Sequence, residues 1–374
     1  MKHIKIPAAL LIIIFLSSCN IFLGPQAEPG PVEILRSLWN DFNEVHAYID
    51  IRMSRNRVIR GDDRVFNNWE EVYVFYEQYL INEIERGFIS VNQTLFNVCG
   101  RMLNELDDPH IGLFAPGDII FPFMEHPDVI RERSWRNIAN YLKDGGNFSP
   151  DTSRNFYYGV FESEPHIGYI HIASFHGDTS QPGVEDWAKY ISEIVQYLAY
   201  TDAIVLDLRS EGGRAPNLEY IAAHFASVQE NYMMVSTKNG PGRNDFYPPT
   251  IHRIKPIDNT YTKYIALLTN KTTVSAAEWF TLALRTQPHV MHMGTATRGA
   301  FSGRIPRPMI NGWYYTISAQ KVTDMNGLTY EGTGISPDPE YILSGDWGEE
   351  RVLSDYPDRQ LNKALEKILE RLSQ

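Results

Sequence analysis

The amino-acid sequence predicts an α/β fold in which a helical domain is followed by a domain of alternating strands and helices and by a carboxyl-terminal helix. Apolar residues recur at helical spacing early in the chain, and from His166 onward short apolar runs alternate with amphipathic ones. Strand, helix, strand, helix in that order indicates a sheet that is at least partly parallel. The length of 374 residues exceeds the roughly 100 to 200 residues of one domain, which predicts two packed units.

The helical domain is predicted over residues 33–113. The run VEILRSLWNDFNEVHAYI has an apolar stripe on one helix face, and NWEEVYVFYEQYLINEI repeats the pattern. The stripe of the first helix consists of Ile34, Leu35, Leu38, Trp39, Phe42 and Val45. A third helix is predicted in SVNQTLFNVCGRMLNEL, with Ser90 as its N-cap. A less regular connecting segment follows over residues 114–157.

The α/β domain is predicted over residues 158–345. The runs HIGYIHIASF, AIVLDLR and YIALLTN indicate buried strands, and WAKYISEIVQYLAY and APNLEYIAAHFAS between them indicate helices. The last segment, residues 346–374, contains an amphipathic helix from Asp358 to Leu372. The strands are therefore predicted to lie between a helical domain and a carboxyl-terminal helix.

Charge and composition exclude one class of partner. The chain has 34 basic and 46 acidic side chains, a formal net charge of −12, and no basic tract. Such a balance argues against a nucleic-acid surface. A hydrophobic content of 43% with 21% charged residues is typical of a globular protein.

The amino terminus resembles a bacterial lipoprotein signal over residues 1–18. Lys2 and Lys5 precede the apolar segment IPAALLIIIFL, and LSSC ends at Cys19. An apolar run of this length is well short of the ~20 residues that span a bilayer. We therefore expect lipid on Cys19, a tether over residues 19–32, and a membrane-anchored protein of the bacterial cell envelope, either periplasmic or surface-exposed. The alternative is a secretory peptide with an incidental cysteine.

The second cysteine, Cys99, would be alone in the mature chain and can form no intramolecular disulfide. It lies in the apolar helical pattern of the third predicted helix. We expect a buried, unreactive thiol.

Two loops fall at the carboxyl ends of predicted strands, where sites of α/β sheets form. The first is DLRSEGGRAPN, in which Gly212 and Gly213 follow a buried strand. Paired glycines allow positive φ and close backbone approach, so their N–H groups can point at an anion. The alternative is that these glycines only turn the chain.

The second loop is NKTTVSAAEWF, which contains Ser275. A serine between a strand and a helix is usually an N-cap, and the spacing from Ser275 to Glu278 fits a capping box. It can also be a nucleophile, with the N–H of Ala276 at the helix start stabilising an oxyanion. The usual Gly-x-Ser-x-Gly elbow is absent, so local sequence alone favours the cap.

Five segments in chain order carry a family resemblance: LDDPHIGLF, AIVLDLRSEGG, YIALLTNKTTVSAAEWF, GTATRGAFSG and YEGTGISPD. They resemble the superfamily of carboxyl-terminal processing proteases, tricorn core proteases and their retinoid-binding relatives. Ser210, Glu211 and Arg214 depart from the glycine-rich pattern that is usual in the second segment. The resemblance covers about residues 33–372 and implies a ClpP/crotonase-like catalytic domain and serine peptidase activity.

The resemblance also distinguishes two mechanisms. Many processing proteases use a Ser-Lys dyad whose lysine follows Thr-x-Gly, but here that turn reads Thr-Arg-Gly and continues with Ala300. Alanine cannot take a proton. Tricorn-like members use a histidine that precedes the sheet and a late glutamate, and His110 and Glu331 stand at the matching positions. The implied catalytic residues are Ser275, His110 and Glu331.

The implied chemistry is self-consistent. A serine hydroxyl needs a base, and a neutral imidazole with a pKa near about 6.5 suits that task. His110 would be the base and then the acid, and Glu331 would fix its tautomer. The N–H of Ala276, with that of Gly212 or Gly213, would hold the oxyanion. No metal or cofactor is required.

Each of these residues also has a structural interpretation. His110 could be a core histidine, and Glu331 could cap a loop. Asp207 and Arg209 are interpreted as a buried structural pair. The remaining histidines of interest fit no metal-ligand spacing with an acidic partner: His166, His224, His252, His289 and His292.

Substrate capture departs from the family pattern. Processing proteases commonly carry a PDZ domain of about 80 to 100 residues, whereas Phe114 to Tyr158 spans about half of that and contains no Gly-Leu-Gly-Phe-like loop. We expect no PDZ domain. A peptide or protein substrate would then add to an exposed sheet edge or bind between the helical and α/β parts.

Two other functions are compatible with the sequence. One is a binding protein with little turnover that takes an apolar ligand or a peptide, as in the retinoid-binding branch. The other is an envelope scaffold whose helical face binds a partner. The three triad residue types at matching positions favour the peptidase.

Overall fold

The computed structural model describes residues 28–54, 65–122, 138–152, 154–176, 183–209, 212, 215–342 and 358–374. The predictions for the signal segment, Cys19 and Gly213 lie outside the described residues. Among the described helices, none is long and apolar enough to cross a membrane.

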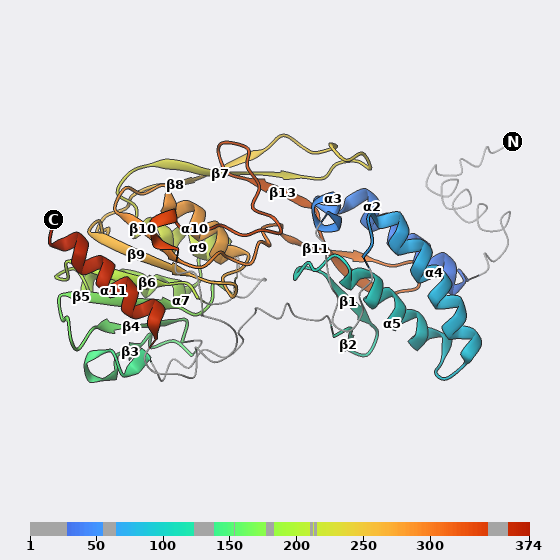
Figure 1. Cartoon of the computed structure of the whole chain (residues 1–374), viewed down its shortest axis with the longest axis horizontal. Coiled ribbons are helices and arrows are strands. Elements are labelled where there is room, and N and C mark those ends of the chain that lie inside the picture. The colour runs from blue at the N-terminus through green and yellow to red at the C-terminus, as the bar shows by residue number, and fades with distance from the viewer. Residues whose placement is uncertain are drawn as a thin grey trace, which may run out of the picture.

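The helical part forms one end of the molecule (Figure 1). Its helices are α2 (Pro31–Val45), α3 (Ile49–Met53), α4 (Trp69–Arg86) and α5 (Val91–Asn104). Four residues of the predicted stripe on α2 are buried: Ile34, Leu35, Leu38 and Phe42. Ser90 caps α5 as predicted, because its hydroxyl accepts a hydrogen bond from the N–H of Gln93 at 3.3 Å. The buried thiol of Cys99 in α5 confirms its interpretation as a core residue.

A small antiparallel sheet packs against these helices. Its strand order is β11 (Arg304–Pro308), β12 (Tyr314–Ser318), β1 (Gly112–Ala115) and β2 (Ile119–Ile120). Residues from β11, β12 and the turn between them fill the core of the helical part: Ile305, Met309, Trp313, Tyr315 and Ile317. The hairpin therefore leaves the α/β part and crosses to the other end of the molecule (Figure 1). An apolar strand pattern does not indicate which of two cores it enters.

The main sheet confirms the predicted α/β arrangement. Its strand order is β10 (Val290–Gly294), β9 (Tyr264–Thr269), β6 (Ala203–Asp207), β5 (Ile167–Ile172), β4 (Phe156–Val160) and β3 (Asn147–Phe148). Strands β5, β6, β9 and β10 are parallel, and β4 and β3 are antiparallel to their neighbours. The carboxyl ends of the parallel strands meet at one edge, where the site forms.

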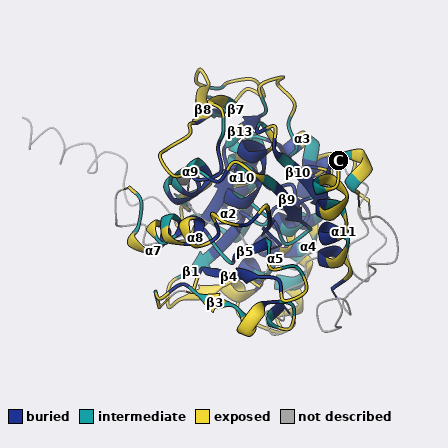
Figure 2. Cartoon of the chain, turned by 90° about the vertical axis from the view of Figure 1, so that its left-hand side faces the viewer, coloured by how far each residue is buried: buried dark blue, intermediate teal, exposed yellow. Residues whose placement is uncertain are grey.

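Helices cover both faces of this sheet (Figure 2). One core contains side chains of α7 (Asp186–Lys189), α8 (Ile191–Tyr197), α9 (Ala215–Ala223) and α10 (Ala276–Arg285). The other contains side chains of α11 (Arg359–Leu372). Alternate residues of one strand face opposite cores: Ile204 of β6 joins the first, and Val205 joins the second. Burial on both faces explains why these strands are continuously apolar.

A separate antiparallel sheet has the order β13 (Gln320–Thr323), β7 (Glu230–Thr237) and β8 (Thr250–Ile254). Two short 3-10 helices, η1 (Lys143–Gly145) and η2 (Pro339–Tyr341), complete the described elements.

The carboxyl-terminal helix is fastened to the sheet by ion pairs. Arg209 contacts Asp207 at 2.9 Å and Asp358, the residue before α11, at 2.7 Å. All three side chains are at least nine-tenths buried. The interpretation of Asp207 and Arg209 as a buried structural pair is confirmed.

Candidate active site

Ser275 lies at the turn between β9 and α10, directly before the first residue of the helix. Its backbone has φ 56° and ψ −118°, whereas an ordinary N-cap is extended. A non-glycine residue at such angles stores about 1 to 3 kcal/mol of strain, and strain of this kind gathers at functional sites. The turn is held to the end of β6, because the Thr273 hydroxyl donates a hydrogen bond to the carbonyl of Leu208 at 2.6 Å.

Glu278 is the buried centre of this turn. Its Oε2 accepts hydrogen bonds from the N–H groups of Ser275 at 3.0 Å and Ala300 at 2.9 Å. Its Oε1 accepts from the Thr297 hydroxyl and the Gly299 N–H, both at 2.6 Å. Burial raises the pKa of Glu278, and these hydrogen bonds oppose the rise. The bond to Ser275 confirms one half of the predicted capping box. The other bonds hold the turn at Thr297–Ala300, which is distant in sequence, next to Ser275.

Two of the residues predicted to hold an oxyanion, Ala276 and Gly212, lie beside Ser275. Ala276 opens α10, and the first N–H groups of a helix lack an intrahelical acceptor. A Cβ atom on Gly212 would lie 2.8 Å from Cβ of Ser275 and 2.6 Å from the carbonyl oxygen of Val274. The backbone of Gly212 therefore packs directly against the serine, at a place that only glycine can occupy.

Ala300 also contacts the serine. Its carbonyl oxygen accepts a hydrogen bond from the N–H of Ser275 at 3.2 Å, and its side chain is buried. The position at which dyad enzymes carry their lysine is thus next to Ser275, with no ionisable group on its side chain.

His110 lies between α5 and β1, with its side chain 8% exposed. Its Nδ1 is buried, has no hydrogen-bond partner among the described residues, and lies 3.8 Å from Oδ1 of Asp108. Burial lowers the pKa of His110 to about 4, although Asp108 opposes this effect. The imidazole is therefore neutral at neutral pH and able to accept a proton.

Glu331 is buried at the same junction but its polar contacts are with other residues. Its carboxylate forms an ion pair with Arg52 of α3 and accepts a hydrogen bond from the N–H of Phe301 at 2.8 Å. Burial raises the pKa of Glu331, and Arg52 opposes the rise. In the described part of the chain no ion pair or hydrogen bond joins Glu331 to His110.

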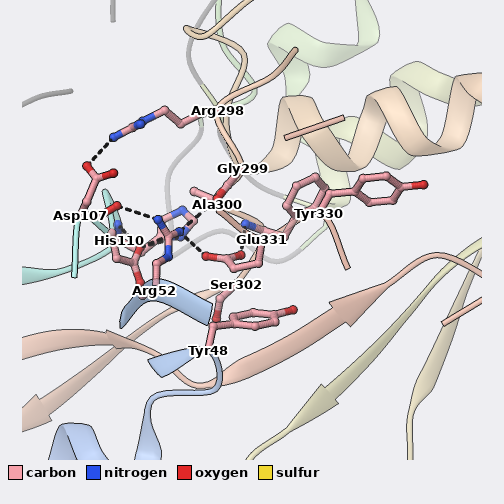
Figure 3. Close-up of polar contacts among 12 residues, drawn as sticks. Tyr48, Arg52, Asp107, His110, Arg298, Gly299, Ala300, Ser302, Tyr330 and Glu331 are labelled. Atoms are coloured by element: carbon pink, nitrogen blue, oxygen red, sulfur yellow. Dashed lines mark hydrogen bonds and ion pairs between the residues drawn. The ribbon is translucent and has the colours of Figure 1, made fainter. Parts of the chain in front are cut away.

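Arg52 connects the residues of the site. Figure 3 shows its guanidinium between Asp107 and His110 on one side and Gly299 and Glu331 on the other. It donates hydrogen bonds to the carbonyl oxygens of Asp107 at 2.7 Å and Gly299 at 3.0 Å. Sequence reasoning missed Arg52, because an arginine in a short helix carries no signal of a partner 279 residues away.

Among the described residues no hydrogen bond or ion pair joins Ser275 to His110, and a chain of contacts through Arg52 links them. Ser275 contacts Ala300, and Gly299 contacts Arg52, which lies 3.9 Å from Asp108. Catalytic hydrogen bonds are often long in unliganded enzymes and shorten when substrate binds.

Comparisons with known proteins give the same family as the motifs. The model of peptidase family S41 matches residues 166–341. The carboxy-terminal processing protease CtpB of Bacillus subtilis strain 168 is 26% identical over 197 residues, which are 50% of this chain and 38% of that protein. The chain thus aligns with little more than a third of this relative.

Two solved structures share the fold over nearly their whole length. A candidate peptidase from Parabacteroides merdae has a TM-score of 0.69 at 22% identity, covering 91% of this chain and 97% of that one. Mature CPAF in complex with lactacystin has a TM-score of 0.59 at 11% identity, covering 92% and 98%. The likeness therefore includes the helical part as well as the sheet.

Proposed function

We propose, because the model of peptidase family S41 matches residues 166–341, that this chain is a serine endopeptidase acting on unfolded or exposed polypeptide segments. The observation that carries the proposal is the strained backbone of Ser275, at φ 56°, between the start of α10 and the backbone of Gly212. A helix cap needs no such strain. Strain of this kind gathers at active sites, which supports a nucleophilic role for Ser275.

In the proposed reaction, Oγ of Ser275 attacks the carbonyl carbon of the scissile peptide and its proton passes to His110. The N–H of Ala276 and a backbone N–H of the Gly212–Gly213 turn stabilise the oxyanion. Losing one such donor typically costs about 2.7 to 4 kcal/mol of transition-state stabilisation. The carbon–nitrogen bond then breaks, His110 returns the proton to the leaving amine, and water hydrolyses the acyl-enzyme.

Glu331 belongs to this machinery in the proposal, as the family resemblance implies. Its recorded contacts support a role in holding the turn at Gly299–Phe301 in place: it accepts from the N–H of Phe301 at 2.8 Å and pairs with Arg52. That turn contacts the backbone of Ser275. We also propose that lipid on Cys19 anchors the enzyme in the bacterial cell envelope.

The test of the proposed function uses the full chain and an unfolded protein such as reduced, carboxymethylated casein. We expect cleavage by the wild type, covalent labelling of Ser275 by a fluorophosphonate, and loss of both in Ser275→Ala. Retention of full peptidase activity in Ser275→Ala would exclude Ser275 as the nucleophile. Absence of cleavage and of labelling in the wild type would instead favour a binding protein.

A further inference from the structure

Asp108 is a carboxylate near the proposed base that neighbouring side chains hold in place. His46, the C-cap of α2, accepts a hydrogen bond at Nδ1 from the N–H of Tyr48 at 3.1 Å. Its Nε2 therefore carries the proton and donates it to Oδ2 of Asp108 at 3.0 Å. Arg52 lies 3.9 Å from Oδ1, and the three side chains are almost completely buried. Burial alone would raise the pKa of Asp108, but Arg52 and His46 hold it well below the usual range.

The other oxygen of Asp108 faces His110. Oδ1 accepts a hydrogen bond from the backbone N–H of His110 at 2.9 Å and lies 3.8 Å from Nδ1 of the same residue. A carboxylate oxygen has about two acceptor sites, so Oδ1 keeps one for the imidazole. The Nδ1 atom is buried and has no hydrogen-bond partner within the described ranges of the chain. A small rotation of the ring, closing the gap by about 1 Å, gives an ordinary N–H···O bond.

Glu331 does not compete for this contact. One of its oxygens is bound by Arg52 and the other by the N–H of Phe301. Its charge is compensated by a guanidinium that is itself buried. Among the described residues, Glu331 therefore contacts the turn at Gly299–Phe301, and Asp108 is the carboxylate that faces the imidazole of His110.

We infer that Asp108 is the carboxylate that orients His110 and stabilises its imidazolium, and that His46 and Arg52 hold Asp108 in position. The inference rests on the proposed roles of Ser275 and His110. As Oγ of Ser275 bonds to the carbonyl carbon, its proton passes to Nε2 of His110, and the positive ring donates Nδ1–H to Asp108. When the carbon–nitrogen bond breaks, the proton on Nε2 passes to the leaving amine. Glu331 acts indirectly, by holding the turn at Gly299–Phe301 in place.

The first experiment compares Asp108→Asn with Glu331→Gln, using casein peptide hydrolysis and melting temperature. Asp108→Asn is expected to lower kcat by about 10³- to 10⁴-fold with KM changed less than about twofold, as for other triad carboxylates. Asp108→Glu is expected to recover part of this loss. Glu331→Gln is expected to lower kcat about tenfold, through the displaced turn. Asp186→Asn, in an exposed pair with Lys189, is the unchanged control.

The pH dependence of fluorophosphonate labelling distinguishes a role of Asp108 in orienting His110 from a role in folding alone. In Asp108→Asn the acid limb is expected to move to lower pH, because the groups that still face His110 are Arg304, Arg52 and His46. In Glu331→Gln the limb is expected to stay. A purely structural role of Asp108 would lower the melting temperature and leave the limb of the folded fraction unmoved, which contradicts the inference.

A further measurement uses the conservative Glu331→Gln variant. A peptide boronate bound to Ser275 leaves His110 protonated, and its Nδ1–H is expected as a low-field proton resonance in both wild type and Glu331→Gln. Loss of the resonance in Glu331→Gln, or a loss of kcat above about 10³-fold there with Asp108→Asn within tenfold of wild type, overturns the inference. If Ser275→Ala keeps its activity, the proposed function itself fails.

Discussion

Arg52 and Glu331 form an ion pair in which both side chains are almost completely buried, although they belong to opposite parts of the molecule. Arg52 lies on α3 of the helical part, and Glu331 follows the last strand of the α/β region. The pair also reaches the turn that contacts Ser275, through the bond from Arg52 to Gly299. The proposed base, His110, and the proposed nucleophile, Ser275, are therefore linked through the contacts of one arginine.

Replacing Arg52 by methionine is expected to destabilise the protein strongly. It would leave Glu331 and Asp108 as buried charges without their guanidinium, and breaking a buried pair from one side typically costs about 3 to 5 kcal/mol. Urea unfolding of the full chain measures this loss. The matched control is Arg36→Met, which removes a guanidinium that is 62% exposed and pairs with Glu77. A loss below about 1 kcal/mol in Arg52→Met would show that the pair is solvated.

Replacing Gly212 by alanine is expected to reduce activity at least about 100-fold. The new Cβ would lie 2.6 Å from the carbonyl oxygen of Val274, closer than atoms pack, so the oxyanion turn or Ser275 must move. The rate of fluorophosphonate labelling checks this. Gly30→Ala, where nothing lies within 4 Å of an added Cβ, is the control. Wild-type labelling in Gly212→Ala would place the oxyanion groups elsewhere.

The rate of fluorophosphonate labelling is expected to change little between pH 7 and pH 5. His110 must be neutral to accept the proton, and its pKa of about 4 keeps about nine-tenths of it neutral at pH 5. A histidine with a pKa of about 6.5 would be neutral in only about 3% of molecules there. We expect the labelling rate at pH 5 to stay within about 20% of its value at pH 7. A roughly 25-fold fall would contradict the burial of the ring.

The same pKa shift has a consequence for stability. Between about pH 6.5 and pH 4 the unfolded chain binds a proton at His110 that the native state does not bind. The free energy of unfolding contributed by this group is therefore complete above pH 6.5 and decreases as the pH falls through that window. His110→Gln is expected to flatten the pH dependence of urea unfolding there. An unchanged slope would contradict the shift.

Replacing Ser275 by glycine is expected to stabilise the protein while abolishing peptidase activity. Glycine adopts positive φ without a Cβ penalty, whereas serine at φ 56° and ψ −118° and alanine in its place are both strained. We expect Ser275→Gly to exceed Ser275→Ala by about 1 kcal/mol in free energy of unfolding. Equal stabilities would mean that the native turn carries no strain.

The sequence predicted the parts of the fold whose signals are local. The stripe of α2 and the apolar runs of β5, β6 and β9 were identifiable because periodicity reports directly on burial. The cap at Ser90 and the buried pair of Asp207 and Arg209 followed from short motifs. These features depend on neighbours in the chain or on a strand end.

The contacts of the site could not be predicted in the same way. The roles of Arg52 and His46 depend on which helix ends meet the sheet, and no spacing along the chain encodes that meeting. Asp108 was visible only as part of the segment LDDPHIGLF, and its two oxygens acquire separate tasks only in three dimensions. Glu278 was expected as a cap, while its hold on Thr297 and Gly299 arises from tertiary packing.

The crossing of the β11–β12 hairpin has a consequence during synthesis. The helical part leaves the ribosome first, but its core is completed by Tyr315 and Ile317, which emerge much later. The carbonyl of His110 is held by the hydroxyl of Thr316, a residue 206 positions further along the chain. In a nascent chain the carbonyl of His110 therefore lacks this hydrogen bond until Thr316 has been synthesised, which is after Ser275.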